Sequence, residues 1–266
     1  MTRALVIPAA GAGTRLGSDR AKALTPVANR PMIDWLIERH APYVTRIVVV
    51  ASAAAGNQLR AHLAASSIAH DVVVQARATG MLDAIRLAEL ALRASSGPLG
   101  SDPNGPLPAW VWITWCDQVA VSAETAARLA RACDEAGEHV AVVMPTVARD
   151  APYIHLARDA EGRIARILQA REGDTMPARG EGDMGLFALS RRAFFELLPQ
   201  FDVEDVARGS GTRERNFLPF LAWLRGRAEV LTFAVDAEIE SIGINTREEL
   251  QRVERHLASM TAGERR

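Results

Sequence analysis

The sequence is poor in cysteine and carries no excess of charge of either sign. Its 266 residues include only two cysteines, Cys116 and Cys133, with no CxxC motif and no histidine pair at metal-ligand spacing. This excludes a disulfide framework and a Cys/His zinc site, and it favours a reducing, cytoplasmic environment. The formal net charge is -1, so the composition gives no electrostatic footprint for nucleic acid or an anionic membrane surface. An anionic ligand must therefore be held by a few placed cations.

Long hydrophobic runs are also missing. The apolar run Ala4 to Ala10 ends at Gly11, so it is too short for the hydrophobic region of a signal peptide. No run approaches the roughly 18 residues that cross a membrane. With 48% hydrophobic and 24% charged residues, the composition is that of a soluble globular protein that is not exported.

The residues present alternate between two periodicities. Short runs rich in β-branched residues are each followed by a stretch with helical spacing. The expected strands are Leu5–Pro8, Ile47–Ala51, Val72–Gln75 and Val111–Thr114, and the helices after them are Pro31–Arg39, Asn57–Ala65, Gly80–Arg93 and Ala123–Ala136. This alternation predicts an α/β fold with a Rossmann-like, doubly wound, mainly parallel sheet covered on both faces. Ligands in such sheets bind at the carboxyl ends of the strands.

The pattern changes after the strand expected at Val140–Pro145. Tyr153–Ala157 and Ile164–Gln169, with a turn between them, predict a small β-hairpin of the kind that forms a substrate wall. Ser95–Pro108 is dense in Ser, Gly and Pro and predicts a surface loop. The remaining expected elements are a loop at Ala170–Gly182, strands at Met184–Leu189 and Val230–Val235, and helices at Glu214–Arg225 and Arg247–Leu257.

A glycine-rich turn follows the first strand. Small residues there let backbone N–H groups approach phosphate oxygens closely. The spacing of Gly11, Gly13 and Gly17 does not fit the dinucleotide fingerprint, and no Gly-Lys-Ser/Thr completes a P-loop. Two cations, Arg15 and Lys22, follow this turn, and a pair of cations beside a phosphate cradle suits a triphosphate.

An acid follows the fourth strand. Asp117 would lie at the carboxyl edge of the sheet, where ligands bind. A hard oxygen there suits Mg²⁺, which prefers one or two carboxylates together with substrate phosphates. Cys116 is expected to be a small buried residue rather than a nucleophile, because no histidine is implied nearby.

These motifs resemble those of the sugar-phosphate nucleotidylyltransferases, especially the uridylyltransferase domain of bacterial N-acetylglucosamine-1-phosphate uridylyltransferase. The resemblance rests on the small-small-Gly-x-Gly-Thr-Arg segment Ala9 to Arg15, on Lys22 and on Pro31-Met32. It implies that Arg15 and Lys22 hold the triphosphate and neutralise charge in the transition state. The implied nucleotide site comprises Ala10, Gly11, Ala12, Gly13, Thr14, Gln75, Gly80 and Cys116.

The resemblance also implies roles for residues further along the chain. Gln75 and Gly80, five positions apart after a strand, would contact a pyrimidine, although Met81 stands where the family has Thr. Asp117 and the Asn of Gly243-Ile244-Asn245 would hold Mg²⁺. Asn245 could also serve as the N-cap of the last helix, because it precedes a run with acidic residues in its first turn, and this role can coexist with the metal role.

The acceptor site departs further from the family pattern. Asp183-Met184-Gly185 stands where the family has Asn-Thr-Gly, so the acceptor stays open. The candidate acceptor-binding residues are Tyr153, Glu172, Asp183, Glu214 and Asn216. The chain has no hexapeptide repeats of an acetyltransferase domain, so a stand-alone transferase is expected.

The function expected is Mg²⁺-dependent transfer of a nucleotidyl group, with release of pyrophosphate. The partners are a nucleoside triphosphate, UTP or another pyrimidine, and a sugar 1-phosphate, with no nucleic acid and no membrane. A cytidylyltransferase acting on a non-sugar phosphate or phosphonate, and a nucleotide sensor without turnover, stay open as alternatives. We expect one domain at residues 1–260, with a nucleotide-binding part at 1–146, an acceptor-binding part at 147–260 and a polar tail at 261–266.

Overall fold

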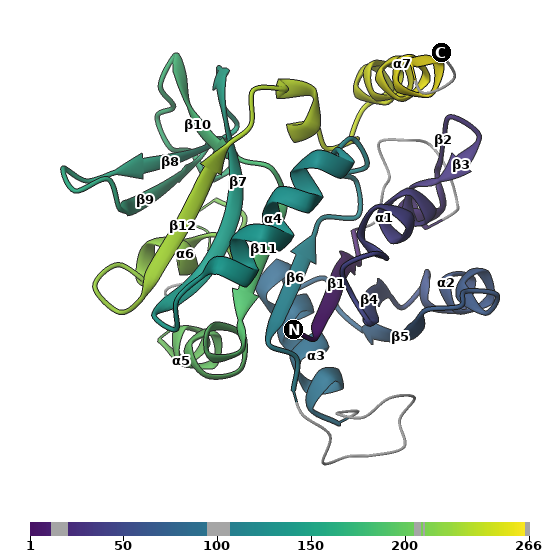
Figure 1. Ribbon diagram of the computed structural model, residues 1–266, viewed down its shortest axis with the longest axis horizontal. Helices are drawn as coiled ribbons and strands as arrows, with labels where there is room; N and C mark the ends of the chain where they lie inside the picture. Colours follow the sequence, from purple (N-terminus) through teal and green to yellow (C-terminus); the bar gives the residue numbers. More distant parts are fainter. Residues whose placement is uncertain (12–20, 95–106, 205–208, 210, 264–266) are drawn as a thin grey trace.

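An eight-stranded sheet forms the centre of the protein. The computed structural model describes residues 1–11, 21–94, 107–204, 209 and 211–263 (Figure 1). Seven strands follow the order β10-β7-β11-β6-β1-β4-β5, and β12 pairs with β7. Their bounds are β1 (Arg3–Ala9), β4 (Arg46–Ser52), β5 (Ala69–Gln75), β6 (Trp110–Thr114), β7 (Val140–Asp150), β10 (Arg179–Asp183), β11 (Leu186–Ser190) and β12 (Glu229–Ala234).

The strands β5, β4, β1 and β6 are parallel neighbours. The chain places β4 on one side of β1 and β6 on the other, so the direction of winding reverses at β1. This is the point at which ligands bind in open α/β sheets. The predicted α/β class, the mainly parallel sheet and its first four strands are confirmed.

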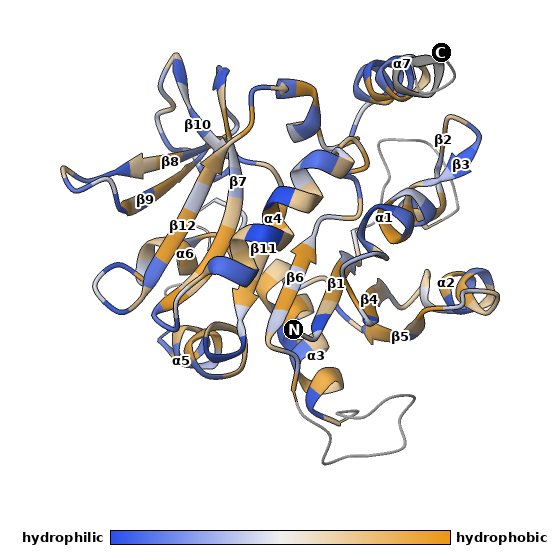
Figure 2. Cartoon of the chain, in the orientation of Figure 1, coloured by the Kyte–Doolittle hydropathy of each residue, from blue (hydrophilic) through white to orange (hydrophobic). Residues whose placement is uncertain are grey.

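Helices cover both faces of the sheet. Leu5 and Ile7 of β1 pack into the core with α1, α2, α4 and α7, while Val6 packs into the core with α3, α5 and α6. The period of two along β1 thus explains why its sequence is apolar without interruption. The strands at the sheet centre are hydrophobic, and hydrophilic residues lie on the outward sides of helices (Figure 2). The helices are α1 (Met32–His40), α2 (Gly56–Leu63), α3 (Met81–Ala94), α4 (Ala123–Glu135), α5 (Leu198–Val203), α6 (Pro219–Trp223) and α7 (Arg247–Gly263).

The second half of the chain confirms the predicted hairpin, formed by β8 (Ile154–Arg158) and β9 (Ile164–Gln169). The prediction of a loop at Ala170–Gly182 is wrong in part, because β10 lies within it and pairs with the far half of β7. Its Arg-Gly-Glu-Gly-Asp sequence has no apolar alternation, since it is an edge strand that buries few side chains. α7 continues past Leu257 to Gly263, into the expected polar tail.

The helix predicted at Glu214–Arg225 is also wrong at its start. Only Pro219–Trp223 is α-helical, because the backbone of Arg215 bonds instead to Thr79 and Leu82. The predicted loop Ser95–Pro108 lies outside the described residues except for its last two positions. Within the described part of the chain, no helix is both long and apolar enough to span a membrane.

Candidate active site

Three predicted site residues meet at the carboxyl edge of the sheet. Lys22 Nζ donates to Asp117 Oδ2 at 2.5 Å and to Asn245 Oδ1 at 2.7 Å. Lys22 opens the short 3-10 turn Lys22–Leu24, Asp117 follows β6, and Asn245 precedes α7. The side chains of Lys22 and Asp117 are only 10% and 14% exposed, so water screens their attraction little. The fold thus assembles a compact cluster from positions separated by 95 and 223 residues.

The backbone fixes the approach of Asn245 to Asp117. Ile244 N–H donates to the backbone carbonyl of Asp117 at 3.2 Å. A Cβ atom on Gly243 would lie 3.2 Å from Asp117 Oδ1, closer than most side chains tolerate. The Asn245 amide donates to the Gly243 carbonyl at 3.2 Å, which leaves its oxygen directed to Lys22. The close approach of Gly243 to Asp117 therefore explains why glycine stands two residues before Asn245.

The N-cap of α7 is Thr246 rather than Asn245. Glu249 N–H donates to Thr246 Oγ1, and Glu249 Oε2 accepts from the N–H groups of Thr246 and Asn245. This reciprocal pattern is a capping box. The alternative interpretation of Asn245 as a helix cap is thus wrong by one position, and its side chain reaches the lysine.

Lys22 is the only lysine in the sequence, and the other side chains among the 31 Lys and Arg are arginines. A lysine ammonium is a compact point charge, whereas an arginine presents a planar fork. Only the former fits between two oxygens that both lie within 2.7 Å of one nitrogen. The chemistry of this position therefore accounts for a lysine in an arginine-rich chain.

Two oxygens converge on the point now taken by the ammonium, and this arrangement fits a Mg²⁺ ion. Magnesium prefers oxygen ligands and completes its shell from phosphates and water, so one carboxylate and one amide oxygen suffice. Among the described residues, no group of three His, Cys, Asp or Glu side chains could hold a metal ion. Asp117 and Asn245 could hold the metal through these two oxygens.

Cys116 lies beside Asp117 and is buried. Its burial, followed by the charge of Asp117, raises the pKa of the Cys116 thiol to about 12. The thiol stays protonated near neutral pH, so it offers no thiolate nucleophile. This agrees with the interpretation of Cys116 as a small buried residue.

The glycine turn is described only at its start. Ala10 and Gly11 directly follow β1 at the carboxyl edge, and none of the described residues lies within 4 Å of a Cβ placed on Gly11. The predicted residues Ala12, Gly13, Thr14 and Arg15 lie outside the described residues.

The predicted base-reading residues are in contact. The buried Gln75 ends β5, and its Nε2 donates to the Gly80 carbonyl at 3.1 Å and to Thr79 Oγ1 at 3.4 Å. Gly80 has a φ of +130°, and a Cβ there would lie 2.2 Å from the Arg215 carbonyl oxygen. Glycine is therefore required at this position on two counts.

The acceptor candidates differ in their surroundings. Glu172 accepts hydrogen bonds from Gly211 N–H, Thr212 N–H and Thr212 Oγ1. Burial alone would raise the pKa of Glu172, but these bonds and the charge of Arg171 hold it below its usual value. Glu214 pairs with Arg171 at 2.9 Å. The Glu172 carboxylate therefore binds the 211–212 backbone.

The other three acceptor candidates lie on separate elements. Asn216 is buried, donates to Gln169 Oε1 and accepts from Leu218 N–H at 3.1 Å. Tyr153 precedes β8 and is 54% exposed. Asp183 ends β10 and accepts from Gly185 N–H at 2.8 Å. Burial raises the pKa of Asp183 to about 6.

Asp183 belongs to the same edge of the sheet as Asp117. Trp115 N–H, just after β6, donates to the Gly185 carbonyl at 3.0 Å. A Cβ on Gly185 would lie 2.5 Å from the Trp115 ring and 2.6 Å from Gln118. The Asp183–Gly185 turn is thus pressed against the strand end that carries Asp117.

With this geometry in place, comparison with known families is decisive. A family model for the MobA-like NTP transferase domain matches residues 5–205. The chain belongs to this family. The matched range of the MobA-like domain includes Lys22, Asp117 and Asp183, whereas Asn245 lies beyond it.

Two curated relatives also match the chain. The bifunctional protein GlmU of Anaeromyxobacter dehalogenans is 31% identical over 272 residues, which cover 97% of this chain and 50% of GlmU. GlmU of Xylella fastidiosa is 32% identical over 170 residues, which cover 64% of this chain and 33% of GlmU. The chain thus spans about half the length of the first relative.

Two crystal structures share the fold. A Bacillus anthracis protein assigned as a glucose-1-phosphate thymidylyltransferase has a TM-score of 0.69 at 16% identity and covers 95% of this chain and 94% of its own. The 4-diphosphocytidyl-2C-methyl-D-erythritol synthase of Anaerococcus prevotii has a TM-score of 0.65 at 11% identity, with 97% and 98% covered. At these identities the likeness concerns the fold.

One residue at the edge of this site was missed from the sequence. Arg215 bonds through its backbone to Thr79 and Leu82, on either side of Gly80. The Arg-Glu-Arg-Asn run around it supplied Glu214 and Asn216 as candidates but did not single out Arg215, because its contacts with residues 79–83 join positions more than 130 residues apart.

Proposed function

We propose that this chain catalyses the Mg²⁺-dependent transfer of a nucleotidyl group from a nucleoside triphosphate to a sugar 1-phosphate. The observation that carries the proposal is the meeting of Lys22, Asp117 and Asn245 around one nitrogen atom. Membership of the MobA-like NTP transferase family supports the reaction type. The position of the cluster, where the winding of the sheet reverses, supports a ligand site there.

The reaction needs no covalent intermediate on the protein. An oxygen of the acceptor phosphate forms a bond to the α-phosphorus, the bond from that phosphorus to the bridging oxygen breaks, and pyrophosphate leaves with the electron pair. Negative charge grows on the leaving group, so a fixed cation stabilises the transition state. We assign this role to Lys22 and, from the sequence motif, to Arg15.

Asp117 and Asn245 would hold Mg²⁺ through one carboxylate and one amide oxygen. The ion, when bound, would neutralise and orient phosphate oxygens. Before substrate binds, Lys22 compensates the charge of Asp117, so the carboxylate keeps its position without a metal. The protein's contribution is then placement of charge rather than proton transfer.

The base and the acceptor are proposed to bind on opposite sides of this cluster. Gln75 and the backbone at Gly80 would contact a pyrimidine, with UTP as the first candidate. On the acceptor side, Glu172 accepts three hydrogen bonds from residues 211–212 and Asn216 is buried, so we propose that they shape the wall. We propose that the exposed Tyr153, with Asp183 and Glu214, meets the acceptor, although Asp183 accepts from Gly185 N–H and Glu214 pairs with Arg171.

The test is a matrix assay of pyrophosphate release. UTP, CTP, dTTP, GTP and ATP are each combined with sugar 1-phosphates and with non-sugar phosphates and phosphonates, with and without Mg²⁺. We expect release with a pyrimidine triphosphate and a sugar 1-phosphate, only when Mg²⁺ is present. A purine preference would refute the base assignment, and binding without release from any pair would leave a nucleotide sensor.

A cytidylyltransferase acting on a non-sugar acceptor is the second candidate. The observation that favours it is Asp183, since a carboxylate stands where the related uridylyltransferase domains have the Asn of Asn-Thr-Gly. An ionised carboxylate accepts hydrogen bonds but does not donate them, whereas an amide does both. Asp183 would therefore favour a different substrate from the one that an Asn would favour. In the matrix assay this candidate predicts turnover with CTP and a non-sugar phosphate.

A further inference from the structure

Residues 211–216 lie between the base-reading pair and the acceptor side. On the acceptor side, Thr212 Oγ1 donates to Glu172 at 2.8 Å and Arg171 donates to Glu214 at 2.9 Å. On the base side, Arg215 N–H donates to the Thr79 carbonyl at 2.9 Å. The two sets of contacts come from one short stretch of chain.

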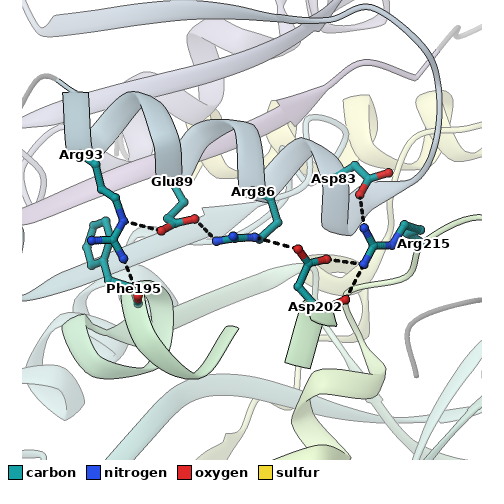
Figure 3. A network of polar contacts seen from close by, with 7 residues as sticks. All are labelled: Asp83, Arg86, Glu89, Arg93, Phe195, Asp202 and Arg215. Carbon is teal, nitrogen blue, oxygen red and sulfur yellow. Dashed lines mark hydrogen bonds and ion pairs between the residues drawn. The ribbon is translucent and has the colours of Figure 1, made fainter. Parts of the chain in front are cut away.

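Arg215 holds the base side through both its backbone and its side chain. Its carbonyl accepts from Leu82 N–H at 3.0 Å. Its guanidinium donates to Asp83 Oδ1 at 3.0 Å, and to the carbonyl at 2.8 Å and the carboxylate of Asp202 (Figure 3). The fork therefore joins the first turn of α3 to the end of α5.

The backbones of Arg215 and Gly80 approach so closely that no side chain fits between them. A single added carbon on Gly80 would lie within 2.8 Å of three backbone atoms of Arg215. Gln75 in turn donates to the Gly80 carbonyl. Because the Arg215 backbone is hydrogen-bonded to Thr79 and Leu82 on either side of Gly80, we expect a displacement of Arg215 to shift Gly80 and the hydrogen bond that orients the Gln75 amide.

We infer that Arg215 is a positioning residue. It holds the base-reading loop, residues 76–80 between β5 and α3, in a fixed position relative to residues 211–216. Base selection and acceptor binding are then energetically coupled, because each ligand favours the arrangement of residues 211–216 that the other needs. This inference rests on the proposed nucleotidyl transfer. It assigns to Arg215 no contact with substrate.

Arg86 provides a matched control in the same network. It donates to Asp202 Oδ2 at 3.1 Å and pairs with the buried Glu89, which also binds Arg93 at 2.5 Å. Its side chain is 24% exposed, against 25% for Arg215. Its partners are Glu89, one turn further along α3, and Asp202 of α5 (Figure 3). Loss of either guanidinium removes a contact with Asp202. Of the two arginines, Arg215 is the one that bonds to Thr79 and Leu82, on either side of Gly80.

The experiment compares Arg215→Lys and Arg86→Lys with the wild type. Affinities for UTP, CTP and ATP are measured by calorimetry, each with and without glucose 1-phosphate or N-acetylglucosamine 1-phosphate, and KM and kcat are measured for the best pair. For Arg215→Lys we expect the KM for the nucleotide to rise about tenfold and the preference between bases to fall, while kcat stays within about twofold of the wild-type value. We also expect that the sugar phosphate no longer changes the affinity for the nucleotide. For Arg86→Lys we expect a lower Tm and an unchanged base preference.

Three outcomes overturn the inference. Arg215→Lys with wild-type base preference and coupling removes the positioning role while leaving the transferase proposal intact. Equal loss of preference in both variants makes the effect a general consequence of losing Asp202 contacts. If the wild type binds no nucleotide, the proposed function fails and the inference falls with it. Should Arg215→Lys not fold, Asp83→Asn removes one arm of the same fork and is held to the same criteria.

Discussion

Lys22 combines three properties that set it apart from the other basic residues. It is the only lysine, it is 9% exposed, and its ammonium bridges two side chains at 2.5 and 2.7 Å. A guanidinium placed there would have to separate Asp117 from Asn245, because its nitrogens cannot occupy one point.

We therefore expect that arginine does not replace Lys22. Lys22→Arg and Lys22→Ala should each lower kcat by roughly 10²-fold or more, since a positioned charge on the transferred group is lost. Pyrophosphate release measures this. Arg131→Lys, in an exposed ion pair on α4 with Glu124, is the control and should retain full activity. Lys22→Arg at the wild-type rate would exclude the bridging role.

Substitution of Asp117 should change both the stability of the apo protein and its stabilisation by Mg²⁺, and thermal unfolding can measure the two separately. Asp117→Asn leaves Lys22 without a carboxylate partner, so we expect the apo protein to lose about 1–3 kcal/mol of stability. It should also lose the extra rise in Tm that Mg²⁺ adds to nucleotide, because a ligand stabilises only through binding to the folded state.

Asp134→Asn is the matched control for that thermal-shift series. Asp134 pairs with Arg3 at 2.5 Å, and Arg3 begins β1 at the opposite end of the strand from Ala10. This variant should lower the apo Tm while keeping the Mg²⁺-dependent increment. If Asp117→Asn keeps the increment as well, Asp117 is not a metal ligand.

Asp183 predicts a pH dependence of stability. Burial raises its folded-state pKa from the ordinary 3.8 to about 6, so the folded state binds the proton more tightly than the unfolded state. Its contribution to stability is therefore present below about pH 4 and is lost as the pH rises to about 6. Asp183→Asn keeps an acceptor for Gly185 N–H and should be more stable than wild type at pH 7.5 by on the order of 2 kcal/mol. Urea unfolding at pH 4 and 7.5 tests this; an equal difference at both pH values contradicts it.

Among the elements, those predicted well from sequence are those whose pattern is set by burial alone. β1 and β6 are apolar because both of their faces pack against helices, and that signal is local. β10 is polar and glycine-rich because it lies at the sheet edge, so its pairing with β7 could not be seen. Motif resemblance placed Lys22, Asp117 and Asn245 in one site, but it did not predict that Lys22 contacts the other two directly. The contact of Arg215 with Gly80 has no local signature.

The close approach of Gly80 to the 211–216 segment gives a prediction at this level. Gly80→Ala combines a strained φ of +130° with a clash against the Arg215 backbone. We expect a loss of about 3 kcal/mol or more and a weakened nucleotide affinity, measured by urea unfolding and calorimetry. Gly162→Ala, at a φ of +79° in a hairpin turn with open space around it, controls for backbone strain alone. If Gly80→Ala and Gly162→Ala lose equal amounts of stability, the packing of Gly80 against Arg215 does not contribute.

At the scale of the whole molecule, the proposed nucleotide-binding and acceptor-binding parts share one sheet and the apolar cluster on each of its faces. β7 pairs with β10, β11 and β12, and Ile113, Phe187 and Phe217 belong to the same apolar cluster. We therefore expect a single calorimetric transition whose van't Hoff and calorimetric enthalpies agree. A fragment of residues 1–146 should not fold. Two resolved transitions would show that the parts are separate domains.

The order of strands also determines how the chain must be made. β11 lies between β6 and β7, although about 70 residues separate it from β6 along the chain. At a synthesis rate of roughly 5–20 residues per second, the newly made β6 waits about 4 to 14 s for its neighbour. During that time a strand of sequence Trp-Val-Trp-Ile-Thr presents an unpaired edge outside the ribosome. We therefore expect contacts between nascent chains at this unpaired edge to lower the yield of native protein.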